Sequence, residues 1–206
     1  MAPLDIIERS VYNEVMARPR EFDSDAVLDR AAEAFRAKGY EGTSVDALER
    51  ATGLRRASLY GAYGDKRALY LAALRRYDAT RAVRLLARVS EARTGRAGLE
   101  GLFAAVLEDA AGDEGGCLVG NAASELGVSD EAVARCVADH RRRMEGDLLS
   151  SLLRGRADGS VKGTGDAPSS ARFLFAAMLG IRALAKSGCA KPELARIART
   201  ALSAVA

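Results

Sequence analysis

The chain has 206 residues, which is enough for one larger domain or two small ones with a hydrophobic core. Hydrophobic residues make up 49% and charged residues 29%, whereas aromatic residues are only 5%, so the composition favours helices over strands. The formal net charge of +3 permits nucleic-acid binding without arguing for it, and no apolar run is long enough to span a bilayer.

The reactive residue types argue against an enzyme and against a metal site. Cys117, Cys136 and Cys189 give an odd cysteine count with no zinc-binding spacing, so we expect free thiols in a reducing cytoplasm. The one histidine, His140, precedes three arginines, a run more typical of a solvated helix face than of a catalytic group. Because no glycine-rich phosphate loop is present either, we expect no catalytic residue, metal or cofactor.

The first 19 residues are expected to form a flexible extension. Met16 opens a stretch that looks like a second protein start, so residues 1–15 are left out of the fold prediction. Arg18, Pro19 and Arg20 form a basic arm, which could enter a minor groove or remain a solvated end.

Residues 20–67 are predicted to contain three short helices. The first is expected to begin at Asp23, a good N-cap residue, and to end at Gly39, because glycine takes a left-handed cap without steric cost. Tyr40 would then fall back on Phe35.

The second and third helices are expected to be joined by a turn at Gly53. Thr43 and Ser44 precede the second helix, with Asp46 three residues after Thr43, in the pattern of a capping box. The third helix is expected over about 55–62. Two helices joined in this way form a helix-turn-helix, whose second helix enters the major groove of DNA.

The polar side chains of this region are candidates for DNA contact. Arginine suits guanine edges or phosphates, serine and tyrosine hydroxyls suit phosphates or bases, and hydroxyls at a helix start suit a phosphate. The predicted DNA-binding residues are Thr43, Ser44, Arg55, Arg56, Ser58, Tyr60, Tyr63 and Lys66.

Lys66 lies in the first turn of a helix that opens at Asp65 and is expected to run on into residues 83–86. A positive charge there opposes the helix dipole, and a bound phosphate would reverse that penalty. The alternative is a solvated lysine offset by Asp65.

Residues 68–206 are predicted to form a helical ligand-binding and dimerisation domain. We expect Gly95 to Gly98 to be a break and residues 158–168 to be a polar loop. The expected further helices span residues 99–111, 117–126, 130–157, 169–187 and 192–205.

The sequence resembles the TetR (tetracycline-repressor-like) family of transcriptional regulators. The resemblance is carried by ARPREFD at 17–23, AFRAKGYEGTSVDALERATGL at 34–54 and SLYGAYGDKRALYLAAL at 58–74. It implies an all-α fold of about nine helices with an N-terminal helix-turn-helix domain and a C-terminal helical domain. It also implies a homodimeric repressor released from a palindromic double-stranded operator by a small-molecule inducer.

The chain departs from the family pattern after the recognition tyrosine. It has Gly61 and Ala62 where bulky residues are frequent, and Tyr63 where phenylalanine is usual. Base readout is therefore expected to rest on the front of the third helix.

Several apolar helix faces behind the helix-turn-helix could enclose an effector or could form the core and the dimer contact. The candidates for effector contact are Phe103, Leu107, Cys117, Asn121, Glu125 and Met178. The resemblance makes the last two helices the dimer-forming pair, with Phe173, Ala177, Ile181, Leu184, Leu194, Ile197 and Leu202 divided between core and interface.

Three polar residues near 117–126 leave alternatives open. Cys117 stands at a predicted helix start, which favours a thiolate, so it could sense oxidants or electrophiles or could be a buried structural residue. Asn121 and Glu125 lie one and two turns further along the same face. They could contact a ligand or could form hydrogen bonds to a neighbouring helix.

Overall fold

The computed structural model describes residues 22–110 and 116–205, and over these ranges it contains nine α-helices and no strand. The predicted all-α class is confirmed. None of the helices described is long and apolar enough to cross a membrane. In chain order the helices are α2 (Ser24–Gly42), α3 (Val45–Thr52), α4 (Arg56–Tyr63), α5 (Lys66–Ser90), α6 (Gly95–Ala110), α7 (Leu118–Glu125), α8 (Glu131–Ala157), α9 (Ala167–Lys186) and α10 (Lys191–Ser203).

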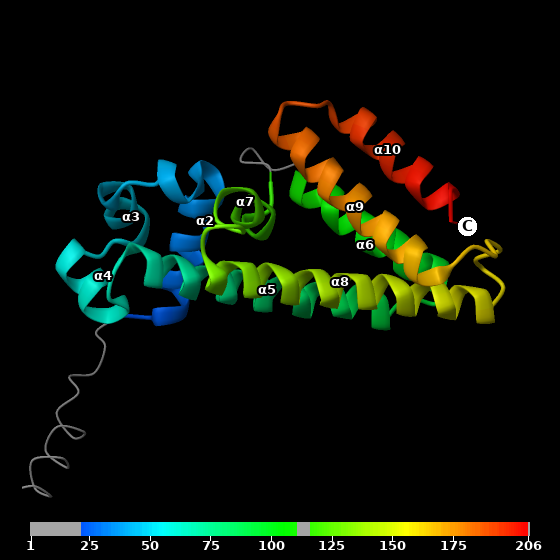
Figure 1. Cartoon of the computed structure of the whole chain (residues 1–206), viewed down its shortest axis with the longest axis horizontal. Helices are drawn as coiled ribbons and strands as arrows, with labels where there is room; N and C mark the ends of the chain where they lie inside the picture. Colours follow the sequence, from blue (N-terminus) through cyan, green and yellow to red (C-terminus); the bar gives the residue numbers. More distant parts are fainter. Residues whose placement is uncertain (1–21, 111–115, 206) are drawn as a thin grey trace, which may run out of the picture.

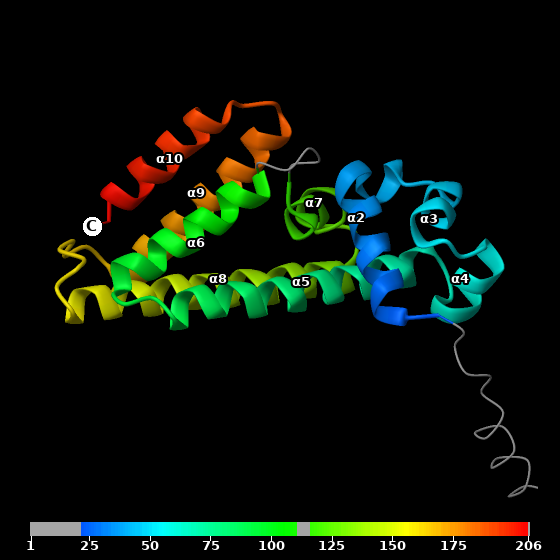
Figure 2. The ribbon, with the colours of Figure 1, turned by 180° about the vertical axis from the view of Figure 1, so that it is seen from behind.

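The molecule is elongated, with α2, α3 and α4, the predicted DNA-binding region, at one end (Figure 1). The long helices α5 and α8 run side by side along the length of the molecule, and α6, α9 and α10 stack over their far half, as both ribbon views show (Figures 1 and 2). The short helix α7 lies between the two parts. This arrangement places α7 where it contacts both α2 and α8.

Helix α2 begins where its sequence predicts, but it kinks at Gly39 and continues to Gly42 rather than ending there. The Asp23 carboxylate accepts hydrogen bonds from the amides of Asp25 and Ala26, which caps the helix. At Gly39 the backbone leaves the helix with φ 76° and ψ 175°, a conformation essentially restricted to glycine. The Tyr40 ring stacks on Phe35 with 6.2 Å between centroids, so this contact is confirmed.

Helix α3 is capped by Ser44. The expected capping box from Thr43 to Asp46 is therefore wrong, because the N-cap is the residue after Thr43. The Ser44 hydroxyl accepts from the amide of Ala47 at 3.2 Å. The helix ends at Gly53, whose φ of 74° places it in the left-handed region, as predicted.

The core of the DNA-binding region continues into α7 and α8. Phe35 of α2 meets Tyr70 of α5 edge to face at 4.9 Å, and Tyr40 contacts the same ring at 4.9 Å. Leu118 of α7 and Val133 of α8 are fully buried in this cluster. The DNA-binding region therefore packs on the rest of the molecule through a continuous apolar core rather than through a mobile linker.

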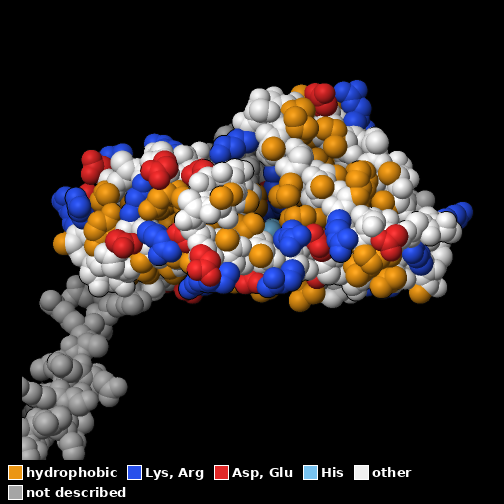
Figure 3. All heavy atoms as spheres, in the orientation of Figure 1, with side chains coloured by type: hydrophobic (Ala, Val, Ile, Leu, Met, Phe, Trp, Pro, Cys, Tyr) orange, Lys and Arg blue, Asp and Glu red, His pale blue; other side chains and the backbone are white. Residues whose placement is uncertain are grey.

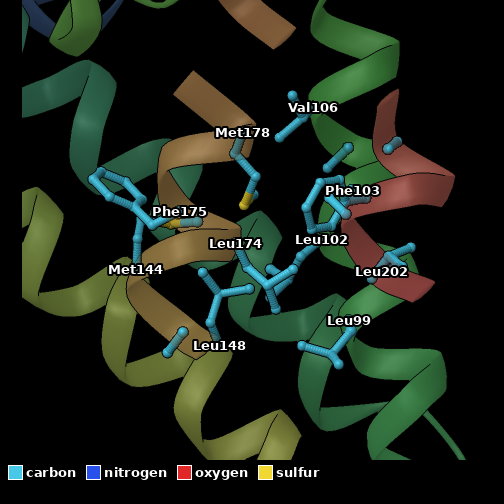
Figure 4. Close-up of a cluster of buried hydrophobic side chains, with 14 of the residues drawn as sticks. Leu99, Leu102, Phe103, Val106, Met144, Leu148, Leu174, Phe175, Met178 and Leu202 are labelled. Carbon is cyan, nitrogen blue, oxygen red and sulfur yellow. The ribbon is translucent and has the colours of Figure 1, made fainter. Parts of the chain in front are cut away.

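A second core fills the space between α6, α8, α9 and α10, and Figure 4 shows part of it. Leu102, Leu148 and Leu174 are completely buried there. Burying one such side chain contributes about 1.5–3 kcal/mol to folding. This core holds the far half of the molecule together.

The break predicted at Gly95 to Gly98 lies instead inside the first turn of α6. A Cβ atom on Gly95 would stand 2.0 Å from the backbone nitrogen of Gly155, and one on Gly98 would stand 3.1 Å from Oγ of Ser151. These glycines allow the backbones of α6 and α8 to approach closely. The other predicted helices are present, and most of their ends are shifted by one or two residues, whereas α2 and α5 continue further, to Gly42 and Ser90.

The expectation of a solvated face at His140 is wrong. His140 is buried, and its Nδ1 lies 2.7 Å from Oδ1 of Asp78 on α5, while Arg143 pairs with the other oxygen of Asp78. Only Arg141 and Arg142 of the run are exposed. Burial opposes ionisation of Asp78, but the hydrogen bonds from His140 and Arg143 hold the pKa of this carboxyl below its usual value.

Candidate DNA-binding surface and effector cavity

Helix α4 presents a short row of exposed polar side chains. Leu59 is fully buried and anchors the helix, whereas Arg55, Arg56 and Ser58 are exposed and Tyr60 is half-buried. The structure thus places these four predicted residues on one accessible helix, at the end of the molecule (Figure 1).

Arg56 is held at both its backbone and its side chain. Its amide donates to Oε1 of Glu49 at 2.6 Å, which joins α4 to α3, and its guanidinium lies 5.5 Å from the centroid of the Tyr60 ring. The two side chains therefore share one orientation, suited to facing a groove together.

Thr43 does not have the position expected of a phosphate ligand. Its side chain is fully buried, and its hydroxyl donates to the carbonyl oxygens of Gly39 at 2.6 Å and Ala34 at 3.3 Å. The hydroxyl closes the turn between α2 and α3, so it has no access to DNA. Ser44, the next residue, is exposed at the start of α3.

Tyr63, the last residue of α4, and Lys66, the first residue of α5, already have partners. The Tyr63 hydroxyl is 2.9 Å from Oγ of Ser24. The Lys66 ammonium lies 4.5 Å from the centroid of the Tyr40 ring. Asp65 caps α5 by accepting from the amide of Ala68 at 2.7 Å, so the predicted helix start is confirmed.

The predicted dimer residues fall into two groups. Ile181, Leu194 and Leu202 are buried in the core of the chain itself, which places them on the core side of the expected division. Phe173 and Leu184 on α9 are 49% and 40% exposed. Ala177 and Ile197 are half-buried. Figure 3 shows hydrophobic side chains gathered over α9 and α10 on this face.

Between α7 and α9 lies a cavity of about 510 Å³ that contains three of the predicted effector residues. Its lining residues are Gly116, Cys117, Gly120, Asn121, Ala123, Ser124, Glu125, Leu179, Arg182, Ala183, Lys186 and Ser187. The other three candidates lie elsewhere: Phe103 and Met178 are buried in the second core between α6 and α9 (Figure 4), and Leu107 packs against that core. None of these three predicted effector residues lines this cavity.

The cavity also contains two cations that the sequence did not single out. Arg182 and Lys186 lie one turn apart on α9 and both line it. Their spacing of four residues places them on one helix face, which was a usable signal. The many apolar residues of α9 dominate its sequence pattern, so this pair of cations is not apparent from the sequence.

Cys117 lies at the start of α7 and is 3% exposed. Burial opposes ionisation, yet the charges of Arg182 and Arg81 and the amides of Gly120 and Val119 hold the pKa of the Cys117 thiol below its usual value. The two arginines and the two amides thus outweigh the effect of burial on this thiol.

Helix α7 connects the cavity to the DNA-binding region by side-chain hydrogen bonds. The Asn121 amide donates to the carbonyl oxygen of Arg36 at 3.0 Å, and Oε2 of Glu125 accepts from the amide of Tyr40 at 2.6 Å. On its other side, Oδ1 of Asn121 accepts from Lys186 at 3.1 Å. Asn121 and Glu125 thus make the helix-to-helix bonds that were one of their two interpretations, and they also line the cavity.

Two family models match this chain. The model described as "Bacterial regulatory proteins, tetR family" matches residues 27–73, and the one described as "Tetracyclin repressor-like, C-terminal domain" matches residues 95–202. The first covers α2 to α4 and the start of α5, and the second covers α6 to α10. Together they cover most of the part that the structure describes.

Relatives of similar length support the same assignment. The chain is 31% identical to the HTH-type transcriptional regulator YezE of Bacillus subtilis over 83% of this chain and 90% of that one. It is 30% identical to the HTH-type transcriptional repressor ComR of Escherichia coli over 90% of each chain.

Solved structures share the whole architecture. A cysteine mutant of the TetR family transcriptional regulator CifR, complexed with 26-base-pair double-strand operator DNA, is 32% identical with a TM-score of 0.79. The match covers 91% of this chain and 99% of that one. The reduced form of E. coli NemR, at 22% identity and a TM-score of 0.76, shares the fold. The chain belongs to the TetR family of DNA-binding transcriptional regulators.

Proposed function

We propose that the protein is a homodimeric repressor that binds a palindromic DNA operator through α4 and is released by a small molecule. The observation that carries this proposal is the row of Arg55, Arg56 and Ser58, exposed together on the second helix of the helix-turn-helix. The operator-bound relative, which aligns over 91% of this chain, supports the same use of this end of the molecule. Residues 20–67 then act as the DNA-binding domain and residues 68–206 as the effector and dimerisation domain.

The DNA contacts divide into base readout and phosphate contact. Arg55, Arg56, Ser58 and Tyr60 read base edges or neighbouring phosphates from α4 in the major groove. The other contacts are to phosphates, from Ser44 and its free helix-start amides, from Tyr63 and from Lys66.

Release works through α7 in this proposal. An effector in the cavity between α7 and α9 shifts α7, and the bonds from Asn121 to Arg36 and from Glu125 to Tyr40 transmit that shift to α2. A change in α2 alters the separation of the two recognition helices of the dimer. The effector therefore lowers affinity for an operator with fixed half-site spacing.

Selection of bound genomic fragments tests the main proposal. The purified protein is incubated with fragmented genomic DNA, and bound fragments are sequenced and footprinted. We expect a palindrome with half-sites about one helical turn apart. Arg56→Ala should weaken binding to the selected fragment by about 10- to 100-fold, whereas Lys162→Ala in the distant loop should not. No enriched sequence at any salt concentration would refute the proposal.

A second candidate function is a redox- or electrophile-sensing repressor switched through Cys117. The lowered pKa of this thiol, caused by Arg182 and Arg81 against the effect of burial, favours this candidate. Hydrogen peroxide or a quinone should then release DNA from the wild type and from Cys189→Ser, but not from Cys117→Ser. Equal release from all three proteins removes the candidate.

A further inference from the structure

Arg182 carries a charge that no group of the described structure neutralises fully. Its side chain is 4% exposed, and its Nε and Nη1 atoms are buried without a hydrogen-bond partner in residues 22–110 and 116–205. The nearest carboxylate oxygen, Oδ2 of Asp109, is 3.9 Å from Nη2. A buried unpaired guanidinium is costly, so its presence points to a partner that binds there.

The neighbouring groups do not supply that partner. Asp109 forms a close ion pair with Arg81 of α5, so one carboxylate serves two guanidinium groups and one positive charge remains in excess. Neither Nε nor Nη1 of Arg182 donates a hydrogen bond to the Cys117 sulfur. Glu125, the acidic residue that lines the cavity, is occupied by the amide of Tyr40.

The cavity beside Arg182 has the size and lining of a small-molecule site. Its volume is about 510 Å³, within the usual range of about 300–1,000 Å³ for ligand pockets. Leu179, Ala183 and Ala123 give it an apolar wall, and Lys186 adds a second cation. A single excess charge next to an apolar wall suits a ligand with one anionic group and a hydrophobic body.

We infer that this cavity binds a small organic carboxylate, with Arg182 as its counter-ion and the apolar wall around its hydrocarbon part. Arginine pairs with carboxylates through charge-assisted hydrogen bonds, which are about twice as strong as neutral ones. The inference deepens the proposed function, on which it rests, because it names the chemical class of the effector.

The position of Lys186 gives the carboxylate a route to the DNA-binding region. Lys186 donates to Asn121, and Asn121 donates to the carbonyl oxygen of Arg36 on α2. A carboxylate held by Arg182 attracts the Lys186 ammonium and weakens its bond to Asn121. The hydrogen-bonded chain from α9 to α2 is then rearranged when the cavity fills.

The test compares two acids with their neutral amides on the full-length protein. Benzoate, octanoate, benzamide and octanamide are titrated at up to millimolar concentration, with thermal unfolding and release of the selected DNA fragment as readouts. We expect both acids to raise the Tm and to release DNA, and both amides to do neither. Arg182→Gln should bind the acids about 10- to 100-fold more weakly, whereas Arg135→Gln, a surface arginine paired within α8, should bind them as the wild type does.

A second variant separates a binding role from a structural one. Without ligand, Arg182→Met should have a higher Tm than the wild type, because it removes a buried unpaired charge. A lower Tm would show that Arg182 holds the fold and would overturn the inference. It is also overturned if neither acid binds the wild type, if the amides bind as tightly as the acids, or if Arg182→Gln binds the acids normally.

The outcomes for this inference and for the proposed function are distinguishable. A protein that binds specific DNA but neither acid keeps the proposed function and loses the carboxylate site. A protein that binds the acids through Arg182 but selects no DNA sequence keeps the carboxylate site and loses the proposed function.

Discussion

At the scale of single residues, several side chains of this regulator have roles set by one or two close partners. Lys66 lies over the Tyr40 ring at the positive end of a helix, Thr43 closes a turn, and Asp78 joins a buried histidine to an arginine. The arrangements at Lys66 and Asp78 each predict the effect of a single substitution.

Replacing Lys66 by alanine should weaken operator binding in a salt-dependent way. The ammonium and the dipole of α5 both attract a phosphate, so the variant should lose about one phosphate contact per subunit, and the slope of log affinity against log salt should become less steep by about 1 for each. Fluorescence anisotropy over a salt series measures this slope. Lys162→Ala is the control, and a Lys66→Ala slope equal to the wild-type slope would contradict the phosphate role.

Replacing Asp78 by asparagine should destabilise the protein by about 1–3 kcal/mol at neutral pH, because His140 and Arg143 lose their shared carboxylate. The pKa of Asp78 is lowered in the folded state, so its contribution is present above the unfolded carboxyl pKa of about 4 and is lost as pH falls through the folded value. Urea unfolding at several pH values measures this. The difference in unfolding free energy between wild type and Asp78→Asn should disappear in acid. The control Asp139→Asn, at an exposed position, should differ little from wild type at any pH. A difference for Asp78→Asn that does not change with pH would contradict the prediction.

At the scale of elements, α7 is the helix through which the proposed release would act. It is only eight residues long, yet it lines the cavity on one side and bonds to α2 on the other. Arg67 of α5 strengthens the adjoining region, because its hydrogen bonds to Asp130 at the start of α8 lower the pKa of that carboxyl to about 2. This pair joins the start of α5, next to the DNA-binding helices, to the start of α8.

Replacing Gly39 by alanine should damage the junction of α2 and α7 more than Gly53→Ala damages the turn between α3 and α4. Both glycines have positive φ, but a Cβ atom on Gly39 would stand 2.2 Å from Oε1 of Glu125, whereas one on Gly53 meets nothing within 4 Å. We expect a loss of about 2–4 kcal/mol for Gly39→Ala and about 1–2 kcal/mol for Gly53→Ala. Urea denaturation measures both, and equal losses would show that the contact with Glu125 contributes nothing.

Removing the charge of Glu125 should uncouple the cavity from the DNA. Glu125→Gln keeps the shape of the side chain but weakens its bond to the Tyr40 amide, so a releasing ligand should lower operator affinity less than in the wild type. Anisotropy with and without ligand gives the coupling factor. Glu131→Gln on the exposed start of α8 is the matched control, and an unchanged coupling factor in Glu125→Gln would place the route elsewhere.

At the scale of the whole molecule, the DNA-binding helices and the exposed apolar surface of α9 lie in different halves of the elongated chain. The DNA-binding helices lie at one end, and the exposed apolar surface of α9 lies in the other half (Figure 1). In a symmetric dimer formed through α9, the two recognition helices are separated by a distance that the bundle sets, so a change in the bundle changes the fit to a palindrome.

Placing a charge on the exposed face of α9 should separate the dimer without unfolding the chain. Leu184 is 40% exposed, so Leu184→Asp leaves the second core intact but buries a carboxylate in the interface. Analytical ultracentrifugation should show a monomer with much weaker operator binding. Val128→Asp, at the fully exposed turn before α8, should stay dimeric, and a dimeric Leu184→Asp would exclude this face of α9.

The sequence by itself determined the elements and the family. Asp23, Asp65 and Asp130 cap helices through hydrogen bonds that span two or three residues, and Gly53 turns the chain through its own φ angle. Such signals lie within a few residues of each other, so a sequence shows them directly. The exposed residues of α4 could be predicted for the same reason, since helical spacing fixes which positions share a face.

The tertiary structure alone decided which polar groups are buried and what surrounds them. Thr43 and His140 are buried, the glycines at 95 and 98 lie inside a helix, and Arg182 and Cys117 line the same cavity. Each fact depends on a partner 4 to 65 residues away in the sequence. Burial and charge are properties of the space between helices, which no local pattern specifies, because the same amphipathic face packs equally well in a core, a dimer or a ligand site.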